Sequence, residues 1–534
     1  MNKKSKKLVA LLLCVATMLS VLAGCGGAST NAGSTAAKPA PSATPAAPAA
    51  PSEPKYKEEI VVALAGEFTT LDAAAGTAIN NQIVQDCTHD LLFDVNLNTG
   101  KFEGELVESW EVIELDHWRF KLKDGIKFHD GTTLNTDDVE FTFKRDAEMG
   151  ATAGYMAKIK EFIKVDDLTF ELKLVQPDVD FYYTFGQQAL AIMSKEAFES
   201  MPEEEAVNIG TGPWKFDKFV AGDYISLVRN EESTLYDVPN TKRLVFRTIP
   251  EAASRMIALE NEEVDIILDP SSTDYTRLSE DNSLQMVTGS SCNLAYLGFN
   301  IKSPNTLMAN VKFREAIACA IDKEELVIAA FDGYAEPSTS IMCREQEYYA
   351  DIDGISYNPE RAQELFNEIG EITISVTASE NGFRKKLAEN FQAQMAKYNG
   401  VKVNLNVMQH TAYLSKLKED PKTSGVELFM ATYAPNMNAD AIFRAPLYTN
   451  GGNNRSHFSS AEVDALIDAG IAETDSSKRA EIYRQLQEKV TCEYIPWVPL
   501  AQPVSALGAS ADVTGFMLHP GNVHQFKNAE VLIG

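Results

Sequence analysis

The sequence contains three short stretches rich in Val, Ile, Leu and Phe: ITISV at residues 372–376, VKVNLNV at 401–407 and VELFMA at 426–431. Runs of this length, rich in Val, Ile, Leu and Phe, are typical of buried β-strands. Between them, residues 383–398 and 413–418 carry apolar side chains at helical spacing. Strands that alternate with helices are typical of a parallel sheet. This part of the chain is therefore predicted to form an α/β lobe.

Helical patterns surround these strands. Residues 313–331 have helical spacing throughout, and Asn358-Pro359 caps a helix that stops at Gly370. Two further helices are predicted after Ser460 and after Asp475, before residues 494–500 return to extended chain.

The N-terminal half is richer in strands. Strands are predicted at 60–64, 118–122, 162–165 and 168–174, and Asp-Gly turns separate several of them. The chain has 534 residues, which is too many for one hydrophobic core. Because ligand pockets favour domain interfaces, we expect two α/β lobes with a ligand cleft between them.

The N-terminus has the pattern of an export signal. Four lysines within residues 1–7 precede an apolar run at 8–22, and Leu22-Ala23-Gly24-Cys25 resembles the lipobox of bacterial lipoproteins. Residues 1–24 are predicted to be a signal peptide, and Cys25 is predicted to carry lipid. Residues 25–56, rich in Ala, Pro, Ser and Gly, read as a disordered linker. The expected location is the outer face of the cytoplasmic membrane or the periplasm.

Composition excludes some functions. The chain has 48 Lys and Arg against 76 Asp and Glu, a net charge of −28, so nucleic acid is a poor partner. Phosphate-binding loops, zinc-protease motifs and nucleophile elbows are absent from the sequence, and its histidines lack ligand-like spacing. We therefore expect no enzyme, no cofactor and no metal site. The cysteines are scattered, without a C-x-x-C pair, and are predicted to be core thiols.

A series of segments, in order along most of the mature chain, resembles bacterial solute-binding protein family 5, the lipoproteins that serve peptide and nickel ABC importers. The most specific are ELVESWEV at 105–112 and IKFHDG at 126–131. Others are GTGPW at 210–214, LGFN at 297–300 and VKFREA at 311–316. Most of these residues suit scaffold roles, and Trp110, Phe128 and Trp214 are expected to be buried.

The resemblance implies the class II periplasmic binding protein fold, with two lobes and an extra N-terminal subdomain. Lobe I would span 57–299, lobe II 300–499, and residues 500–534 would return to lobe I. The crossings would lie near 299–300 and 499–502. The implied function is a lipid-anchored, monomeric receptor that captures a peptide or another medium-sized polar solute and delivers it to ABC permease subunits. Sensing without transport remains the alternative.

In peptide binders of this family, an aspartate after the last strand of the α/β lobe pairs with the ligand's α-amine. Asn436 falls at that position, so a neutral amide replaces the expected carboxylate. Asp440 could take over this role, and Asn438 and Tyr433 are further candidates. The ligand stays open between a peptide and another polar solute, such as an oligosaccharide, an opine-like conjugate or a metal chelate.

Other candidate ligand residues come from two loops. Glu380 and Arg384 match a loop that reaches the ligand's carboxylate end in some peptide binders, although Arg384 has the alternative of a solvent-exposed charge. In the first lobe, FTTLD at 68–72 resembles a loop that opens toward the cleft. Thr70 and Asp72 are the candidates there.

Overall fold

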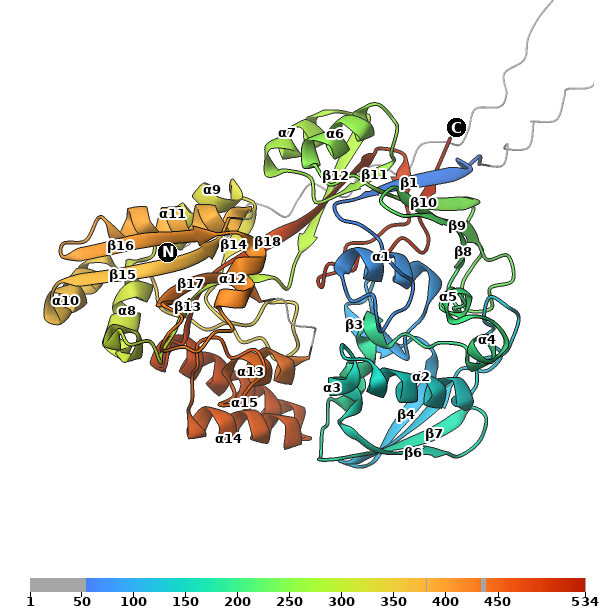
Figure 1. Cartoon of the computed structure of the whole chain (residues 1–534), viewed down its shortest axis with the longest axis horizontal. Helices are drawn as coiled ribbons and strands as arrows, with labels where there is room; N and C mark the ends of the chain where they lie inside the picture. The colour runs from blue at the N-terminus through green and yellow to red at the C-terminus, as the bar shows by residue number, and fades with distance from the viewer. Residues whose placement is uncertain (1–53, 381, 434–437, 534) are drawn as a thin grey trace, which may run out of the picture. The chain divides into compact units, whose positions relative to one another are not determined.

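The alternating strands and helices of the C-terminal half form one end of a large sheet. The structure is a computed structural model that describes residues 54–380, 382–433 and 438–533. In it, β15 (Ile372–Ser379) is parallel to β16 (Val401–Met408) and to β17 (Leu428–Tyr433). The predicted strand-helix-strand units are therefore confirmed, and Figure 1 shows them in yellow and orange.

Helices cover this sheet and bury its apolar side chains in two clusters. One cluster receives side chains from α8 (Val311–Ala320), α9 (Lys323–Phe331), α10 (Pro359–Ile369) and α11 (Phe383–Met395). The other receives them from α12 (His410–Lys416), α13 (Ala439–Leu447), α14 (Ala461–Ala472) and α15 (Ser476–Glu488). This is lobe II.

The helix predicted over 313–331 is interrupted, so that prediction was wrong in one respect. α8 ends at Ala320 and α9 begins at Lys323. Asp322 caps α9 by accepting a hydrogen bond from the N–H of Glu325 at 3.0 Å. The side chain of Gln394 bonds both the N–H and the carbonyl of Asp322, at 2.8 and 2.9 Å. The Asp322 cap and the two hydrogen bonds from Gln394 thus satisfy backbone N–H and carbonyl groups that the break between the helices would leave unpaired.

The first lobe has its own part of the sheet. β1 (Glu59–Leu64) lies between β10 (Arg243–Thr248) and β11 (Ile266–Leu268), parallel to both. β9 (Tyr224–Arg229) and β8 (Trp214–Val220) extend it in antiparallel fashion. Trp214 is fully buried in this core, as expected.

An additional subdomain stands between β3 and β8. Its antiparallel sheet has the order β4 (Val107–Glu114), β5 (His117–Leu122), β7 (Thr169–Leu174) and β6 (Ile159–Lys164). The helix α2 (Thr136–Glu148) packs on it through Val139 and Phe143. The two-lobe fold with an extra N-terminal subdomain is thus the observed architecture.

Trp110 does not have the burial that its motif suggested. It is 41% exposed, whereas Phe128 is 2% exposed. Trp110 lies on β4, an edge strand of the subdomain, and its ring packs edge-on against Phe93 and stacks on Tyr182. A strand at a sheet edge has fewer neighbours to cover it, which accounts for the difference.

One strand, β18 (Trp497–Ser510), belongs to both lobes (Figure 1). Its first part pairs with β13 (Leu294–Phe299), and its last part pairs with β12 (Leu284–Ser290) and β11. β13 also pairs with β17, so it belongs to the sheet of lobe II. We therefore propose that the first crossing lies at 291–293, earlier than the predicted 299–300, and that the second lies within β18.

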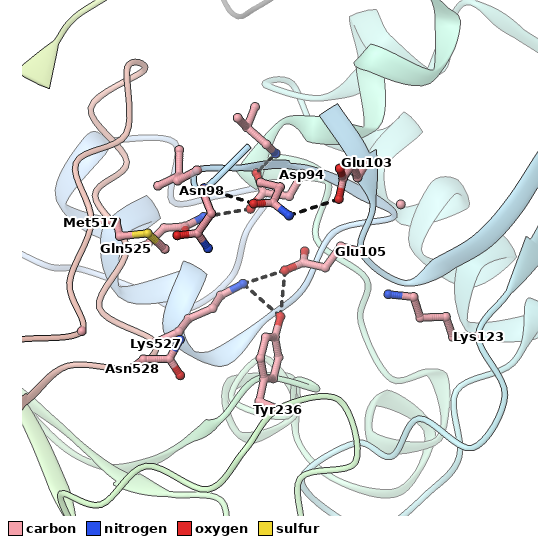
Figure 2. A pocket seen from close by; sticks show the side chains of 15 residues that line it. Asp94, Asn98, Glu103, Glu105, Lys123, Tyr236, Met517, Gln525, Lys527 and Asn528 are labelled. Carbon is pink, nitrogen blue, oxygen red and sulfur yellow. Dashed lines mark hydrogen bonds and ion pairs between the residues drawn. The ribbon is translucent and has the colours of Figure 1, made fainter. Parts of the chain in front are cut away.

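The C-terminal segment is fixed to the first lobe by a buried lysine. Lys527 donates to Glu105 at 2.7 Å and to Asp90 at 3.2 Å. Although burial lowers the pKa of Lys527, the nearby carboxylates of Asp86 and Glu105 raise it well above its usual range. Figure 2 shows Lys527 and Tyr236 meeting Glu105 at a polar cavity of about 300 Å³. This network accounts for the return of residues after 510 to lobe I.

The predicted N-terminal signal and Cys25 lie outside the described residues. The predicted linker ends earlier than residue 56, because Tyr56 bridges to Leu532 and the N–H of Ile533 donates to the carbonyl of Lys55 at 2.7 Å. Among the described helices, none combines the length and the apolar character needed to cross a bilayer.

The remaining elements are short or peripheral. The helices are α1 (Ile79–Thr88), α3 (Ala153–Met156), α4 (Lys195–Ser200), α5 (Glu203–Ala206), α6 (Ala252–Glu260) and α7 (Tyr275–Glu280). The strands are β2 (Phe93–Asn96), β3 (Lys101–Gly104), β14 (Ala335–Pro337), β19 (Val513–Thr514) and β20 (Glu530–Val531). Turns of 3-10 helix occupy Phe181–Gly186, Gln188–Leu190, Ser272–Asp274 and Thr306–Ala309, and a π-turn occupies Lys489–Glu493.

Candidate functional site

The first-lobe candidates follow β1. The buried carboxylate of Asp72 accepts two hydrogen bonds from Arg145, at 2.9 and 2.6 Å. The hydroxyl of Thr70 accepts from the N–H of Asp72 at 3.0 Å, and Gln85 donates to the carbonyls of both residues. Asp72 is thus already neutralised by a guanidinium, and its described contacts fix the shape of the loop. Thr70 remains half-buried beside it.

Glu380 and Arg384 lie beyond the carboxyl end of β15. Glu380 is exposed, and its N–H donates to the carbonyl of Met408 at 2.9 Å. Arg384 is in the first turn of α11, where its guanidinium donates to the hydroxyl of Thr432 at 2.6 Å and lies 5.0 Å from the centre of the Phe383 ring. Arg384 therefore reaches across the sheet edge to the end of β17.

The loop after β17 holds the remaining candidates. Asn436 lies outside the described residues. Asn438 is the N-cap of α13 and accepts from the N–H groups of Asp440 and Ala441. The buried Asp440 carboxylate pairs with Arg444, whose Nε lies 3.0 and 2.9 Å from its two oxygens. The negative charge proposed for a ligand amine is therefore compensated within the helix.

Tyr433 is the last residue of β17 and contacts both α13 and Trp497. Its hydroxyl donates to the carbonyl of Ala441 at 2.8 Å, and its ring meets Trp497 edge-on at 5.6 Å. The side chain is half-buried, and burial raises its pKa beyond the usual tyrosine range. Tyr155 of the subdomain adds to this rise.

Charged residues of lobe I also influence the Asp440 carboxylate. Its charge interacts with those of Asp178 and Lys158, which form an ion pair of 3.2 Å in the subdomain. The structure therefore brings Tyr433, Asp440 and Arg384 to the second-lobe side of the site. Within the residues that the structure describes, Thr70 and Asp72 form no hydrogen bond or ion pair to that side.

Sequence reasoning missed a second arginine. Arg455 follows α13, and its Nε donates to the side chain of Asn453 at 3.0 Å. The next residue, Ser456, accepts from Trp497 at 3.0 Å, which ties this loop to the ring that Tyr433 contacts. Burial raises the pKa of Tyr413, and the guanidinium groups of Arg455 and Arg384 both oppose that rise. Both cations are therefore near the same phenol.

These two arginines lack a carboxylate partner among the described residues. Arg384 bonds to a hydroxyl and Arg455 to an amide, whereas Arg444 nearby is paired with Asp440 and Asp468. Residue 381 and residues 434–437 are Asn, Ala, Pro, Asn and Met, which carry no carboxylate either. A site with two uncompensated guanidinium groups favours an anionic ligand group. An arginine in the GGNNR loop at 451–455 was the available sequence signal.

Neither clustered carboxylates nor clustered histidines suggest other chemistry here. In the part of the chain that the structure describes, no group of three or more His, Cys, Asp and Glu side chains could hold a metal ion.

Comparison with known proteins agrees with this fold. A family model described as "Bacterial extracellular solute-binding proteins, family 5 Middle" matches residues 101–455. The chain belongs to this family. The match covers the subdomain, the first crossing, the helix that carries Arg384 and the loop that ends at Arg455.

Relatives match over most of their length. Heme-binding protein A of Haemophilus influenzae is 28% identical, over 85% of this chain and 88% of its own. The dipeptide-binding protein of Escherichia coli is 26% identical, over 83% and 89%. A crystal structure of the ABC transporter substrate-binding protein CtaP of Listeria monocytogenes has a TM-score of 0.80 at 21% identity and covers 89% of this chain and all of that one.

Proposed function

We propose that this family 5 protein captures a solute with a carboxylate group between its two lobes and delivers it to an ABC importer. The observation that carries the ligand class is the pair of uncompensated arginines, Arg384 and Arg455. Charge-assisted hydrogen bonds from guanidinium to carboxylate are among the strongest in proteins, particularly when both groups leave water. Burial also lowers the pKa of Arg384, as expected for a desolvated cation without a counter-charge.

The amine end of a peptide would have weaker recognition. Asp440 is paired with Arg444 and position 436 is an asparagine. A ligand ammonium would have to compete with Arg444 for the same carboxylate, or enter without a counter-charge. The proposal therefore includes peptide-like ligands with a blocked or distant amine, opine-like conjugates and other organic acids. Relatives named for heme and for dipeptides show how varied the ligands of such proteins are.

The remaining proposals follow the family and the N-terminal sequence. The protein would act outside the cytoplasm as a monomer, with no catalytic step, held to the membrane by lipid on Cys25. Permease subunits would recognise the closed, loaded form. Replacing Cys25 with serine is expected to release the protein from membranes without changing ligand binding.

Matched pairs of ligands test the carboxylate requirement. The full chain, purified in detergent, is scanned for thermal unfolding with tri-alanine against its C-terminal amide, glutathione against its diethyl ester, and hemin against its dimethyl ester. N-acetyl-tri-alanine tests the amine. A ligand at 100-fold its Kd adds about 2.7 kcal/mol of stability. At least one acid should raise the unfolding temperature while its neutral partner does not. Equal shifts within every pair, or none in any, would contradict the proposal.

A further inference from the structure

Two buried cysteines lie beside the first crossing between the lobes. Cys292 is in the crossing segment between β12 and β13, and Cys343 lies six residues after β14. Each is 1% exposed. They are 51 positions apart in the sequence, so their spacing gives no hint of a relationship.

Strand pairing brings the two segments together. Ser290, at the end of β12, is opposite Val504 of β18. Ala335, at the start of β14, is opposite Pro503, the preceding residue of β18. Ser291 and Glu336 line one cavity of about 160 Å³ with these β18 residues. The segment with Cys343 leaves β14 at Pro337, opposite Ala501, and Gln502 of β18, which also lines this cavity, donates to Glu345 at 2.8 Å. Both cysteine-bearing segments therefore lie close to residues 501–504 of β18.

The thiols themselves meet. The Cys343 thiol is hydrogen-bonded to the Cys292 thiol, and this bond, together with burial, raises the pKa of Cys343. Among the other described cysteines, Cys87 bonds to the carbonyl of Ile83 in its own helix, Cys319 lies in α8, and Cys492 is exposed. The prediction of core thiols is thus wrong for Cys492.

We propose that Cys292 and Cys343 are a site of disulfide formation that ties the first crossing segment to the loop after β14. Members of this family act outside the cytoplasm, where disulfides form and persist. The oxidant is an external disulfide. A thiolate of the pair attacks it and releases one thiol, and the second cysteine then displaces the other thiol. The two protein thiols lose two electrons and two protons, and the external disulfide becomes two thiols.

The bond would act at the hinge. The crossing segment and β18 connect the lobes, and lobe closure requires dihedral changes in such segments. A covalent tie at 292 restricts one crossing while leaving β18 unchanged. We expect the oxidised protein to unfold at a higher temperature than the reduced protein, because the bond closes a loop of about 50 residues in the unfolded chain.

Peptide mapping tests the proposal on the full chain. The purified protein is incubated for hours at pH 8.5 with oxidised glutathione or with dithiothreitol, alkylated in denaturant and digested with trypsin. Cys292 falls in peptide 278–302 and Cys343 in peptide 324–344, each with a single cysteine. Oxidation should yield these two peptides as one species, lighter than their sum by two hydrogens, and dithiothreitol should separate them.

Two variants sharpen the result. Cys343→Ser should abolish the linked species, and Cys319→Ser, another buried thiol, should retain it. Alkylated Cys292 and Cys343 in separate peptides after oxidation of the wild-type protein would overturn the proposal. So would linkage of Cys292 to glutathione alone, because the second step would then not occur.

Discussion

Arg479 of α15 forms a buried ion pair with Asp180 of the subdomain, 299 positions earlier in the chain. One guanidinium nitrogen lies 2.6 Å from a carboxylate oxygen, and a second bond joins the other oxygen. The guanidinium also lies over the rings of Tyr348 and Tyr483. Nearby, the N–H of Val179 donates to the carbonyl of Ile471 at 3.2 Å. In addition to β18, this contact joins the first lobe, through its subdomain, to lobe II.

Removing one partner of this pair should be costly. Asp180→Asn leaves a buried guanidinium without its counter-charge, and we expect the free energy of unfolding to fall by about 3 kcal/mol. Replacing both residues, as Asp180→Leu with Arg479→Met, should restore most of that loss, because no uncompensated charge remains. Urea unfolding of the single and double variants measures both. A double variant less stable than either single variant would contradict a role based on charge compensation.

Arg384 and Arg455 should each matter for affinity more than for stability. Because a charge-assisted hydrogen bond contributes about 1.5–3 kcal/mol, Arg384→Gln and Arg455→Gln should each weaken binding of a carboxylate ligand at least about tenfold. Calorimetric titration gives the change. Arg361→Gln is the matched control, because Arg361 pairs with Glu315 on an exposed surface and should leave affinity unchanged.

Asp440 should show the opposite behaviour. Its described contacts are the ion pair with Arg444 and the backbone bond to Asn438, so Asp440→Asn should lower stability by about 1–3 kcal/mol. Affinity for tri-alanine and for N-acetyl-tri-alanine should change less than twofold. Should the variant keep its stability and lose affinity only for the free-amine peptide, Asp440 would be the amine-binding residue after all.

His129 should make stability depend on pH. Its Nε2 lies 3.0 Å from the carbonyl of Gly212, and the N–H of Gly210 donates to its Nδ1 at 3.2 Å, so the neutral ring is the form that fits. Burial lowers the pKa of His129 to about 4, below its unfolded value near 6.5. The unfolded chain therefore binds the extra proton first, and stability is lost as pH falls from about 6.5 to about 4.

A variant isolates this contribution. Buried carboxyls such as Asp94 and Asp146, whose pKa burial raises to about 7, act in the opposite direction over part of this range. They are common to the wild type and to His129→Gln. The stability difference between the two proteins should therefore change by up to about 1.4 kcal/mol per pH unit between pH 6.5 and 4. A difference independent of pH would show that His129 is already charged in the folded state.

The cap at Asp322 explains why the sequence predicted one helix over 313–331 where the structure has α8 and α9. Residues 313–331 have unbroken helical spacing, and only the tertiary bonds from Gln394 and the cap to Glu325 divide them. Asp322→Ala should destabilise the protein by about 1 kcal/mol. Glu324→Ala is the control, because Glu324 lies in the first turn of α9 and does not form the capping bond. It should lower the free energy of unfolding by less. Equal losses would show that the cap contributes nothing.

Local patterns predicted the parallel strands of lobe II because their Val, Ile, Leu and Phe residues are typical of strands and because helical patterns alternate with them. The position of the first crossing could not be predicted in this way, since the run at β13 suits either lobe and its pairing with β17 involves residues 129 to 139 positions away. The same holds for charge. That Asp72 and Asp440 are paired, and that Arg455 is not, depends on which side chains meet in three dimensions.

The most direct test of the central claim uses the double variant Arg384→Gln/Arg455→Gln in the thermal scan with tri-alanine, glutathione, hemin and their neutral partners. We predict that at least one acid stabilises the wild-type protein and fails to stabilise the double variant, while both proteins unfold at similar temperatures without ligand. Equal stabilisation of both proteins by every acid that binds, or binding of the neutral partners alone, would contradict a carboxylate-binding site at these two arginines.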